Sequence, residues 1–506
     1  MHKLLIDHLN LQIEHEQEEF QEAQAAPIFT VPVFEHIEKE LTDSSESRFP
    51  QYGLLGGLSE KLSEKTTVSN NGQDPRIFFN IASPSSTFVC GSQGSGKSHT
   101  LSCLLENCLF SSKASKLVNP LTGLVFHYDT FISDAGGSPC EAAFLSSNPD
   151  ITVRVLCSPA NIRIIQRVYH GLNVQIEPLC INESDLNTKR MLDLMAVSQD
   201  DGPMPLYLHI VNRILRDMRI EQQEANTTFD YQSFKLRLMD TGMTPAQLGP
   251  LSQRLDTLES FMPKAQTGAE QSYMRRGGFR GKGKERGKAA GKTGNDWTPE
   301  PGRLTIVDLS CPCITSEGAC SLFNICLSIF LEQNLDVGRV IALDEAHKYM
   351  NTSAEASTLT NTLLSTVRLQ RHLGARVIIS TQEPTISPSL LDLSSIVIVH
   401  RFTSPEWLNS LKRHLAGATS NLLDGENADS DGLASSRGNG DGAKRLFAEI
   451  VKLRVGEALL FSPSAMIDVE VGSNGKVAMK RLGDGFLKIR VRIRLTADGG
   501  KSIVAT

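Results

Sequence analysis

A glycine-rich loop near residue 91 has the residue types and the spacing to hold a phosphate chain. Residues 91–98 read Gly-Ser-Gln-Gly-Ser-Gly-Lys-Ser and fit the pattern G-x-x-x-x-G-K-[ST]. The glycines let the backbone curl so that successive N–H groups point at phosphate oxygens, and the positive end of a following helix strengthens this. We therefore expect nucleotide contacts from the loop and the residue after it, namely Gly91, Ser92, Gln93, Gly94, Ser95, Gly96, Lys97, Ser98 and His99.

The segments on either side of the loop support this interpretation. Residues 86–90 are typical of a buried strand, and apolar residues recur at helical spacing from 101 to 109. Between them, Lys97 is expected to reach the β and γ phosphates of ATP and the Ser98 hydroxyl to ligate Mg²⁺. The alternative is a tight glycine turn that carries a surface lysine.

Two adjacent carboxylates follow another buried strand. Asp344 and Glu345 come directly after the apolar residues 340–343, and open parallel sheets bind ligands at the carboxyl ends of their strands. Asp344 is expected to hold Mg²⁺ through its water shell, and Glu345 to orient and polarise the attacking water. The second acid favours hydrolysis over nucleotide storage. The alternative is a pair of acids that cap the next helix, and His347 is expected to be a packing or polar-contact residue.

Further along the chain, a glutamine and three arginines are candidates for sensing or stabilising the γ phosphate. The predicted strand 375–381 ends in Gln382, whose amide can hydrogen-bond the γ oxygen or the lytic water, unless the backbone satisfies it. Arg371 is the favoured arginine finger, donated by an adjacent subunit to stabilise charge in the transition state. Arg401 and Arg368 remain alternatives.

These motifs lie in a chain whose pattern predicts an α/β fold with a mainly parallel sheet. Short branched apolar runs alternate with helical periods, as expected for strands that helices cover on both faces. The expected strands are 87–90, 124–128, 151–156, 304–309, 339–343, 375–380 and 396–400.

Composition divides the chain into seven segments. A basic, glycine-rich stretch and a Gly/Ser/Asn/Asp-rich stretch cannot bury a core, so both are expected to be disordered. The segments are an N-terminal part of uncertain, partly helical fold (1–84), the first part of an ATPase core (85–159), an inserted helical subdomain (160–266), the basic insertion (267–300), the second part of the core (301–415), the acidic insertion (416–444) and a β-rich C-terminal part (445–506).

The overall composition limits the classes of function and location. The 506 residues are 40% hydrophobic with a net charge of −6, so no global positive field recruits nucleic acid. No apolar run reaches the ~20 residues of a membrane span, and the N-terminus has no secretory leader pattern. The ten cysteines occur singly, which indicates reduced, mostly buried thiols in a cytoplasmic or nuclear protein without a membrane partner.

Taken together, these motifs resemble the HerA/FtsK group of P-loop ATPases, and HerA most closely. Five blocks agree in order and spacing within residues 85–465, including a long helical insertion before the acid pair. The blocks are 91–98, 125–129, 305–310, 341–347 and 371–384. The sequence departs from the group in three ways. Residues 1–84 show no clear β-barrel, and the basic insertion (267–300) and the acidic insertion (416–444) are foreign to the family pattern.

The resemblance implies a RecA-type core whose sensor strand lies between the phosphate-loop strand and the acid strand. It also implies a homo-oligomeric, hexameric ring with ATP sites at subunit interfaces, which moves double-stranded DNA. By motif, Lys97 and Ser98 would bind nucleotide and metal, Glu345 would activate water, Gln382 would sense the phosphate and Arg371 would be the finger.

Three functions remain open on the sequence alone. The first is a ring-forming DNA translocase with an unidentified nuclease or other protein partner, whose basic segment contacts phosphates. The second is an ATP-dependent protein-remodelling factor or switch. The third is a nonhydrolytic nucleotide-binding or RNA-associated protein, which the arginine–glycine character of residues 275–286 suggests.

Overall fold

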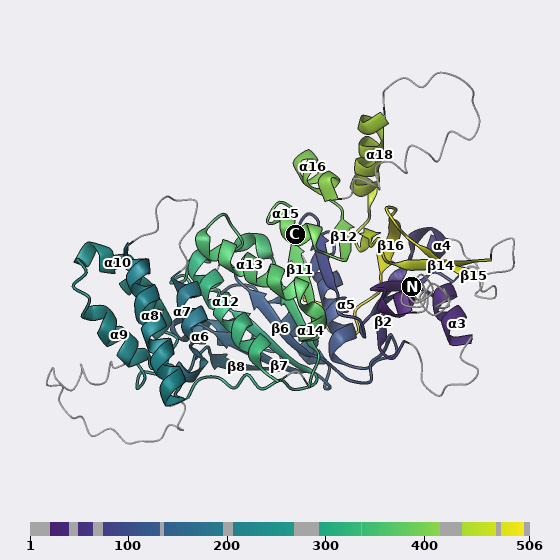
Figure 1. Cartoon of the computed structure of the whole chain (residues 1–506). Helices are drawn as coiled ribbons and strands as arrows, with labels where there is room; N and C mark the ends of the chain where they lie inside the picture. Colours follow the sequence, from purple (N-terminus) through teal and green to yellow (C-terminus); the bar gives the residue numbers. More distant parts are fainter. Residues whose placement is uncertain are drawn as a thin grey trace, which may run out of the picture.

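The computed structural model describes residues 21–39, 49–63, 74–131, 136–195, 206–267, 293–334, 336–414, 438–471 and 477–499. They form a single large sheet with helices on both faces (Figure 1). The central part of this sheet is parallel, as the alternation of apolar runs and helical periods predicts. The bulk of the basic insertion (268–292) and of the acidic insertion (415–437) lies outside the described residues.

The parallel part of the sheet contains every strand expected from the sequence. Its order is β12-β4-β11-β10-β6-β9-β7-β8, and each neighbouring pair is parallel. Strand β11 lies between β4 and β10, so the RecA-type order implied by the family resemblance is confirmed. The strands are β4 (Ser86–Cys90), β6 (Thr122–His127), β7 (Thr152–Cys157), β8 (Val174–Pro178), β9 (Arg303–Asp308), β10 (Arg339–Leu343), β11 (Ala375–Thr381) and β12 (Ile396–His400).

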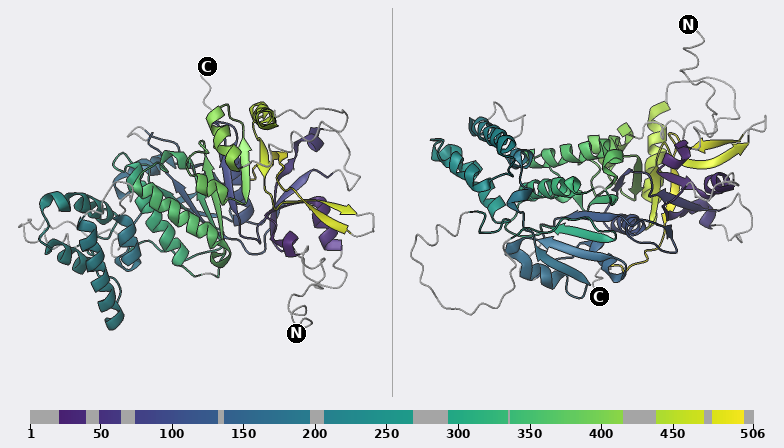
Figure 2. Two further views of the ribbon diagram at one scale, coloured as in Figure 1. Left: turned by 45° about the horizontal axis from the view of Figure 1, so that its top comes forward. Right: turned by 60° about the horizontal axis from the view of Figure 1, so that its bottom comes forward.

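Alternate side chains of these strands face two separate apolar cores. In β4, Phe88 packs in one core with helices α12 (Ser316–Glu332) and α13 (Ala354–Arg368), and Val89 packs in the other with α5 (Lys97–Leu109). The right-hand view of Figure 2 shows helices on both sides of the sheet. Because both faces are covered, the strands are continuously apolar rather than alternating. The core is therefore a three-layer α/β/α structure.

The segment expected to be a helical insertion, 160–266, is only partly so. Its first residues form α6 (Ile162–Val168) and β8, which extends the parallel sheet beside β7. The helical expectation is wrong here because β8 is a half-exposed edge strand with the alternating sequence Val-Gln-Ile-Glu-Pro. A group of helices then stands at this end of the sheet (Figures 1 and 2): α7 (Thr188–Leu194), α8 (Leu206–Ala225), α9 (Tyr231–Met239) and α10 (Pro245–Glu259).

At the opposite end, N-terminal and C-terminal strands continue the sheet together. The order from the outer edge is β15-β14-β1-β3-β2-β16-β13, and β13 pairs antiparallel with β12. This union of the two chain ends was not predicted. The elements are β1 (Ile28–Thr30), α3 (Val31–Lys39), β2 (Tyr52–Leu58), α4 (Ser59–Ser63), β3 (Arg76–Asn80), β5 (Ser115–Lys116), β13 (Glu457–Phe461), β14 (Met466–Val471), β15 (Val477–Arg481) and β16 (Leu487–Val491).

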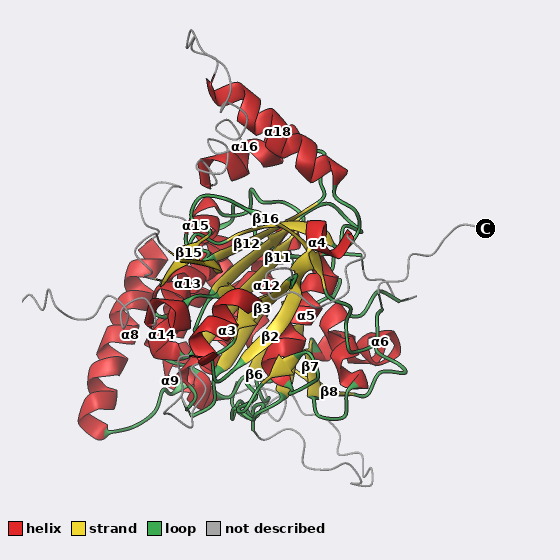
Figure 3. Ribbon diagram, turned by 90° about the vertical axis from the view of Figure 1, so that its right-hand side faces the viewer, coloured by secondary structure: helices red, strands yellow, loops and turns green. Residues whose placement is uncertain are grey.

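Three other expectations require correction. Residues 438–444 of the acidic insertion and the start of the β-rich segment belong to helix α18 (Gly438–Lys452), which lies beside α16 (Pro405–His414) above the sheet (Figure 3). Residues 293–300 of the basic insertion are ordered, because Trp297 is buried against the core. In the segment expected to be β-rich, 445–506, β16 is the last described strand, and Ile493 beyond it is 85% exposed.

The cysteines have the state predicted for them. All ten are free, and eight of them are buried. Among the helices of the described residues, none is long and apolar enough to cross a membrane.

Candidate functional site

The predicted site residues meet because three parallel strands end at one edge of the sheet. Cys90 at the end of β4 pairs with Thr381 of β11, and Ile379 of β11 pairs with Leu343 of β10. The phosphate loop, Gln382 and the acid pair therefore follow three adjacent strands at nearly the same level. This is the edge at which open α/β sheets bind ligands.

The phosphate loop has the curled backbone that its glycines predict. The φ angles are 151° at Gly91, 72° at Gly94 and 116° at Gly96, a region that residues with a side chain rarely adopt. At Gly91 there is also no room for a side chain, since a Cβ would lie 2.6 Å from Cβ of His400. The loop leads directly into helix α5, which begins at Lys97. The backbone N–H groups of the phosphate loop and the N-terminus of α5 are thus placed to bind an anion.

Lys97 is buried inside the loop and lies in the field of both acids. Its ammonium donates a 3.1 Å hydrogen bond to the carbonyl of Ser92, and the residue is 4% exposed. Burial lowers the pKa of Lys97, whereas the carboxylates of Glu345 and Asp344 oppose this shift. The lysine and the two carboxylates therefore belong to one electrostatic site.

Neighbouring segments brace the loop from its flank. The carbonyl of Arg401, just after β12, accepts hydrogen bonds from the backbone N–H of Ser92 at 2.9 Å and from its hydroxyl at 2.8 Å. The backbone N–H of Gly456, just before β13, donates to the carbonyl of Ser95 at 3.3 Å. The two strands that join the core to the terminal strands thus hold the loop in its curled form.

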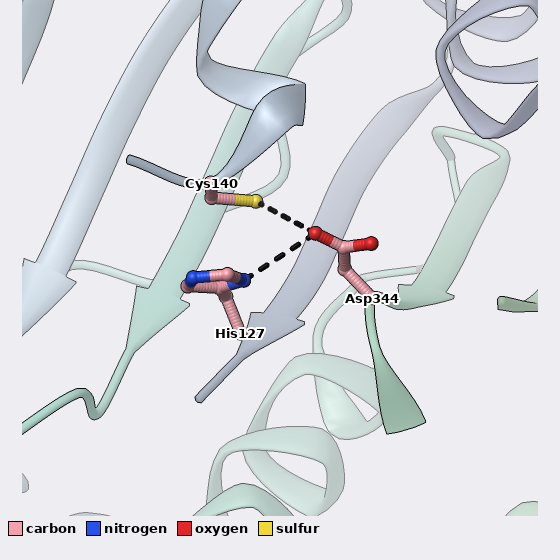
Figure 4. Close-up of side chains that lie close together, drawn as sticks. All are labelled: His127, Cys140 and Asp344. Atoms are coloured by element: carbon pink, nitrogen blue, oxygen red, sulfur yellow. Dashed lines mark hydrogen bonds and ion pairs between the residues drawn. The ribbon is translucent and has the colours of Figure 1, made fainter. Parts of the chain in front are cut away.

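Asp344 is a buried carboxylate with one oxygen engaged and one available. Its Oδ2 lies 3.3 Å from Nδ1 of His127 and 3.7 Å from Sγ of Cys140 (Figure 4). Its Oδ1 is buried without a hydrogen-bond partner among the described residues. Burial alone would raise the pKa of Asp344, but hydrogen bonding and charge from His127 hold it below its usual value. A charged, unsatisfied oxygen fits the role of a magnesium ligand, together with the half-buried Ser98 at the start of α5.

Glu345 is held directly against Gln382. The Gln382 amide Nε2 donates a 2.9 Å hydrogen bond to Glu345 Oε2, and His347 Nε2 lies 3.5 Å from the same oxygen. Glu345 has φ 48° and ψ 44°, and among the described residues only Asn226 is another non-glycine with positive φ. Such a conformation costs about 1–3 kcal/mol and is found mainly at functional sites. His347 thus makes the polar contact expected of it, and burial lowers the pKa of its imidazole although Glu345 opposes this.

The remaining predicted site residues lie as follows. His99 Nε2 is 2.8 Å from the carbonyl of Arg492, so its ring faces the C-terminal segment. Arg401 follows β12 beside the phosphate loop, but its side chain is exposed. Arg371 is exposed in α14 (Gln370–Leu373), before the start of β11, and Arg368 ends α13. Strand β11, which has 7 residues, separates Arg371 from the phosphate loop of the same chain by ~20 Å. Arg371 could therefore act as an arginine finger only at the nucleotide site of a neighbouring subunit.

Two histidines of the site region were not predicted. His400 is fully buried under the loop, with Nε2 2.9 Å from the Thr100 hydroxyl and Nδ1 2.9 Å from the Glu457 carbonyl. His127 ends β6 beside Asp344. Both are final residues of apolar strands at the functional edge, and this position is the signal in the sequence that could have identified them.

Comparisons with known proteins give only remote matches. No family model and no curated protein matches the sequence. VirB4 of Thermoanaerobacter pseudethanolicus aligns over 87% of this chain and 96% of its own, with 12% identity and a TM-score of 0.48. The plasmid coupling protein TrwB in complex with a non-hydrolysable GTP analogue aligns over 90% of this chain and 98% of its own, with 12% identity and a TM-score of 0.44.

The fold assignment depends on the chain's own geometry. The curled loop follows β4, and β11 separates β4 from the acid strand β10. The protein has the RecA-like P-loop NTPase fold. Its strand order is the one that the resemblance to the HerA/FtsK group implied.

Proposed function

We propose that this protein binds ATP with Mg²⁺ and hydrolyses it. The observation that carries the proposal is the hydrogen bond between Gln382 and Glu345 at the strand edge that also bears Lys97. A carboxylate anchored by an amide next to a phosphate loop is suited to position a water molecule for attack. Nucleotide storage alone would not require this pair.

Each residue would contribute positioning or charge rather than covalent chemistry. The loop N–H groups and Lys97 would bind the β and γ phosphates, with Ser98 and Asp344 as the residues that would hold Mg²⁺. Bound magnesium would neutralise charge on the phosphates. Glu345 would orient the attacking water and accept its proton, and Gln382 would fix the carboxylate and contact the γ phosphate or the water.

ATP turnover by the purified full chain tests this proposal, with Lys97→Met as the decisive variant. Loss of the ammonium is expected to abolish both turnover and the stabilisation by ATP, which amounts to about 2.7 kcal/mol at a ligand concentration of 100 times the Kd. Lys113→Met, which removes an exposed lysine in the loop after α5, is the matched control and should retain both. A wild-type protein that neither binds nor hydrolyses ATP would refute the proposal.

We further propose that hydrolysis drives movement along double-stranded DNA in a homo-oligomeric ring. The support is the family resemblance of the five sequence blocks, together with the exposed Arg371, which lies too far from its own phosphate loop to act there. Duplex DNA is expected to stimulate turnover at low salt, and light scattering with ATP analogue and DNA should give a hexamer. A monomer without DNA stimulation would rule out the ring motor while leaving the ATPase intact.

A second candidate function is ATP-dependent remodelling of a protein partner. The helices beyond β8 favour it, because Ile220 of α8 and Leu236 and Met239 of α9 are 52%, 72% and 52% exposed. Exposed apolar side chains grouped on one subdomain are typical of a protein-binding surface. Protein partners captured in an ATP-dependent way, without DNA stimulation of turnover, would support this function over the first.

A further inference from the structure

Three side chains with metal-binding atoms converge behind the acid pair. They are His127 at the end of β6, Cys140 before η2 (Glu141–Ser147) and Asp344 after β10, and Figure 4 shows all three pointing toward one another. Their ligand atoms all lie within 4.8 Å of one another, and all three residues are buried. The sequence predicted Asp344 as a magnesium ligand but indicated no role for His127 or Cys140.

Two of the three separations between the ligand atoms match those of a tetrahedral metal site. Bond lengths of about 2.0–2.1 Å to nitrogen and oxygen and about 2.3 Å to sulfur place tetrahedral neighbours about 3.3 Å apart for N and O, and about 3.6 Å apart for S and O. The observed separations are 3.3 Å between His127 Nδ1 and Asp344 Oδ2, and 3.7 Å between Cys140 Sγ and the same oxygen. The third separation, between His127 and Sγ of Cys140, lies within 4.8 Å, so the three side chains are near enough to close on one cation.

Two polar atoms of the group are also left without a partner. Nε2 of His127 and Oδ1 of Asp344 are buried without a hydrogen bond among the described residues. Buried polar atoms normally have partners, and an ion-binding site is one accepted reason for an exception. His127 is 5% exposed, so bulk water does not compensate.

We propose that His127, Cys140 and Asp344 form a binding site for a thiophilic divalent cation, with Zn²⁺ the best match to one nitrogen, one sulfur and one oxygen ligand. This donor set differs from the all-oxygen set that Mg²⁺ prefers. Binding would convert the Cys140 thiol to a thiolate and release its proton to solvent. Three protein ligands leave a fourth tetrahedral position for water.

The proposed cation site shares Asp344 with the nucleotide site, so a bound cation would affect ATP hydrolysis. A cation on Oδ2 would draw the carboxylate toward His127 and away from the phosphate loop. This consequence rests on the proposed ATPase function, whereas binding of the cation does not. We expect Zn²⁺ to lower ATP turnover in the wild-type chain.

Titration of the metal-free full chain with Co²⁺ tests the binding itself. One equivalent of Co²⁺ should produce the thiolate-to-cobalt charge-transfer absorption and the visible bands of a tetrahedral site. Cys140→Ser should remove the charge-transfer band and weaken binding at least ~100-fold, as expected when a ligand rather than an outer-shell group is lost. Cys326→Ser, a buried cysteine of α12 in the opposite core, is the matched control and should keep the band.

Two results would overturn the proposal: no charge-transfer band in the wild type, or a band that persists in Cys140→Ser. His127→Asn, with a folded-state check by circular dichroism, provides a second ligand deletion should the cysteine variant be unstable. Turnover is measured separately, as the ratio with and without Zn²⁺ within each variant. A chain that hydrolyses ATP but binds no Co²⁺ fails only the metal proposal, and one that binds Co²⁺ without hydrolysis fails only the proposed function.

Discussion

Gln382 donates a 2.9 Å hydrogen bond from its side-chain amide to Oε2 of Glu345, across the ends of two neighbouring parallel strands. The contact orients a carboxylate whose own backbone is in the left-handed region. The hydrogen bond and the left-handed backbone together orient the Glu345 carboxylate at the edge of the sheet that carries the phosphate loop. Both can be tested by small substitutions.

Glu345→Gln should reduce kcat by about 100-fold or more, because a positioned general base typically contributes a factor of 10² to 10⁴. Nucleotide affinity should change little, since the loop and Lys97 remain. Steady-state turnover and equilibrium binding of a fluorescent ATP analogue measure the two effects. Glu383→Gln, the same change at an exposed acid nearby, should behave as the wild type. If Glu345→Gln turned over ATP as fast as the wild type, Glu345 would have no part in the mechanism.

Gln382→Ala should lower kcat by about 100-fold or more while leaving KM within a few-fold, since one preorganised hydrogen bond of this kind is typically worth a factor of 10²–10³ when it acts in the transition state. Gln175→Ala, at an exposed position of β8, is the control. A rise in KM with kcat unchanged would show instead that Gln382 serves ground-state binding.

The sequence predicted the parallel core because each core strand is a continuous apolar run bounded by turn residues. It also predicted that four motif residues lie close together, because the carboxyl ends of adjacent parallel strands meet at one edge of the sheet. These residues are Lys97, Asp344, Glu345 and Gln382. The pairing of N-terminal with C-terminal strands could not be predicted in this way. Short strands such as Ile28–Thr30 carry little periodicity, and one of the two partner strands lies more than 400 positions away, as in the pairing of Phe29 with Met466.

The sequence predicted a β-rich C-terminal part, but the course of the chain after β16 was not predicted, for a different physical reason. After β16 the chain does not continue as a strand, because Arg492 forms a buried 2.7 Å ion pair with Glu106 of α5. Glu106 and Arg492 are far apart in the sequence, so no local sequence pattern indicates that they form an ion pair. The segment therefore packs on the helix that follows the phosphate loop.

Glu106→Gln is expected to destabilise the protein by about 3–5 kcal/mol, because it leaves the Arg492 guanidinium buried without its charge partner. Glu106 also accepts hydrogen bonds from the backbone N–H groups of Leu495 and Thr496, at 3.1 Å and 2.9 Å. Hydrogen exchange should accelerate first in residues 492–499. Glu470→Gln, in an exposed pair with Lys480, should leave the stability nearly unchanged, because solvent screens the pair. Unchanged exchange in the C-terminal segment of Glu106→Gln would contradict the assigned role of the pair.

His400 should make the stability of the phosphate-loop region depend on pH. Burial lowers the pKa of this imidazole from 6.5 to about 4, and the nearby charges of Lys97 and His99 act in the same direction, against the hydrogen bond to the Glu457 carbonyl. The folded protein therefore keeps His400 neutral while the unfolded chain takes up a proton below pH 6.5. The stability that His400 contributes is complete above pH 6.5 and is lost as the pH falls toward 4, by about 3 kcal/mol in total.

His400→Gln isolates this effect because glutamine can hydrogen-bond Thr100 but does not titrate. Denaturation of both proteins at a series of pH values should show the wild type losing about 3 kcal/mol more than the variant between pH 7 and pH 4. Only the difference between the two is compared, so the titration of all other groups cancels. Parallel curves for the two proteins would mean that His400 takes up its proton in the folded protein over the same pH range as in the unfolded chain. Its ring could then not accept a hydrogen bond from the Thr100 hydroxyl under the phosphate loop.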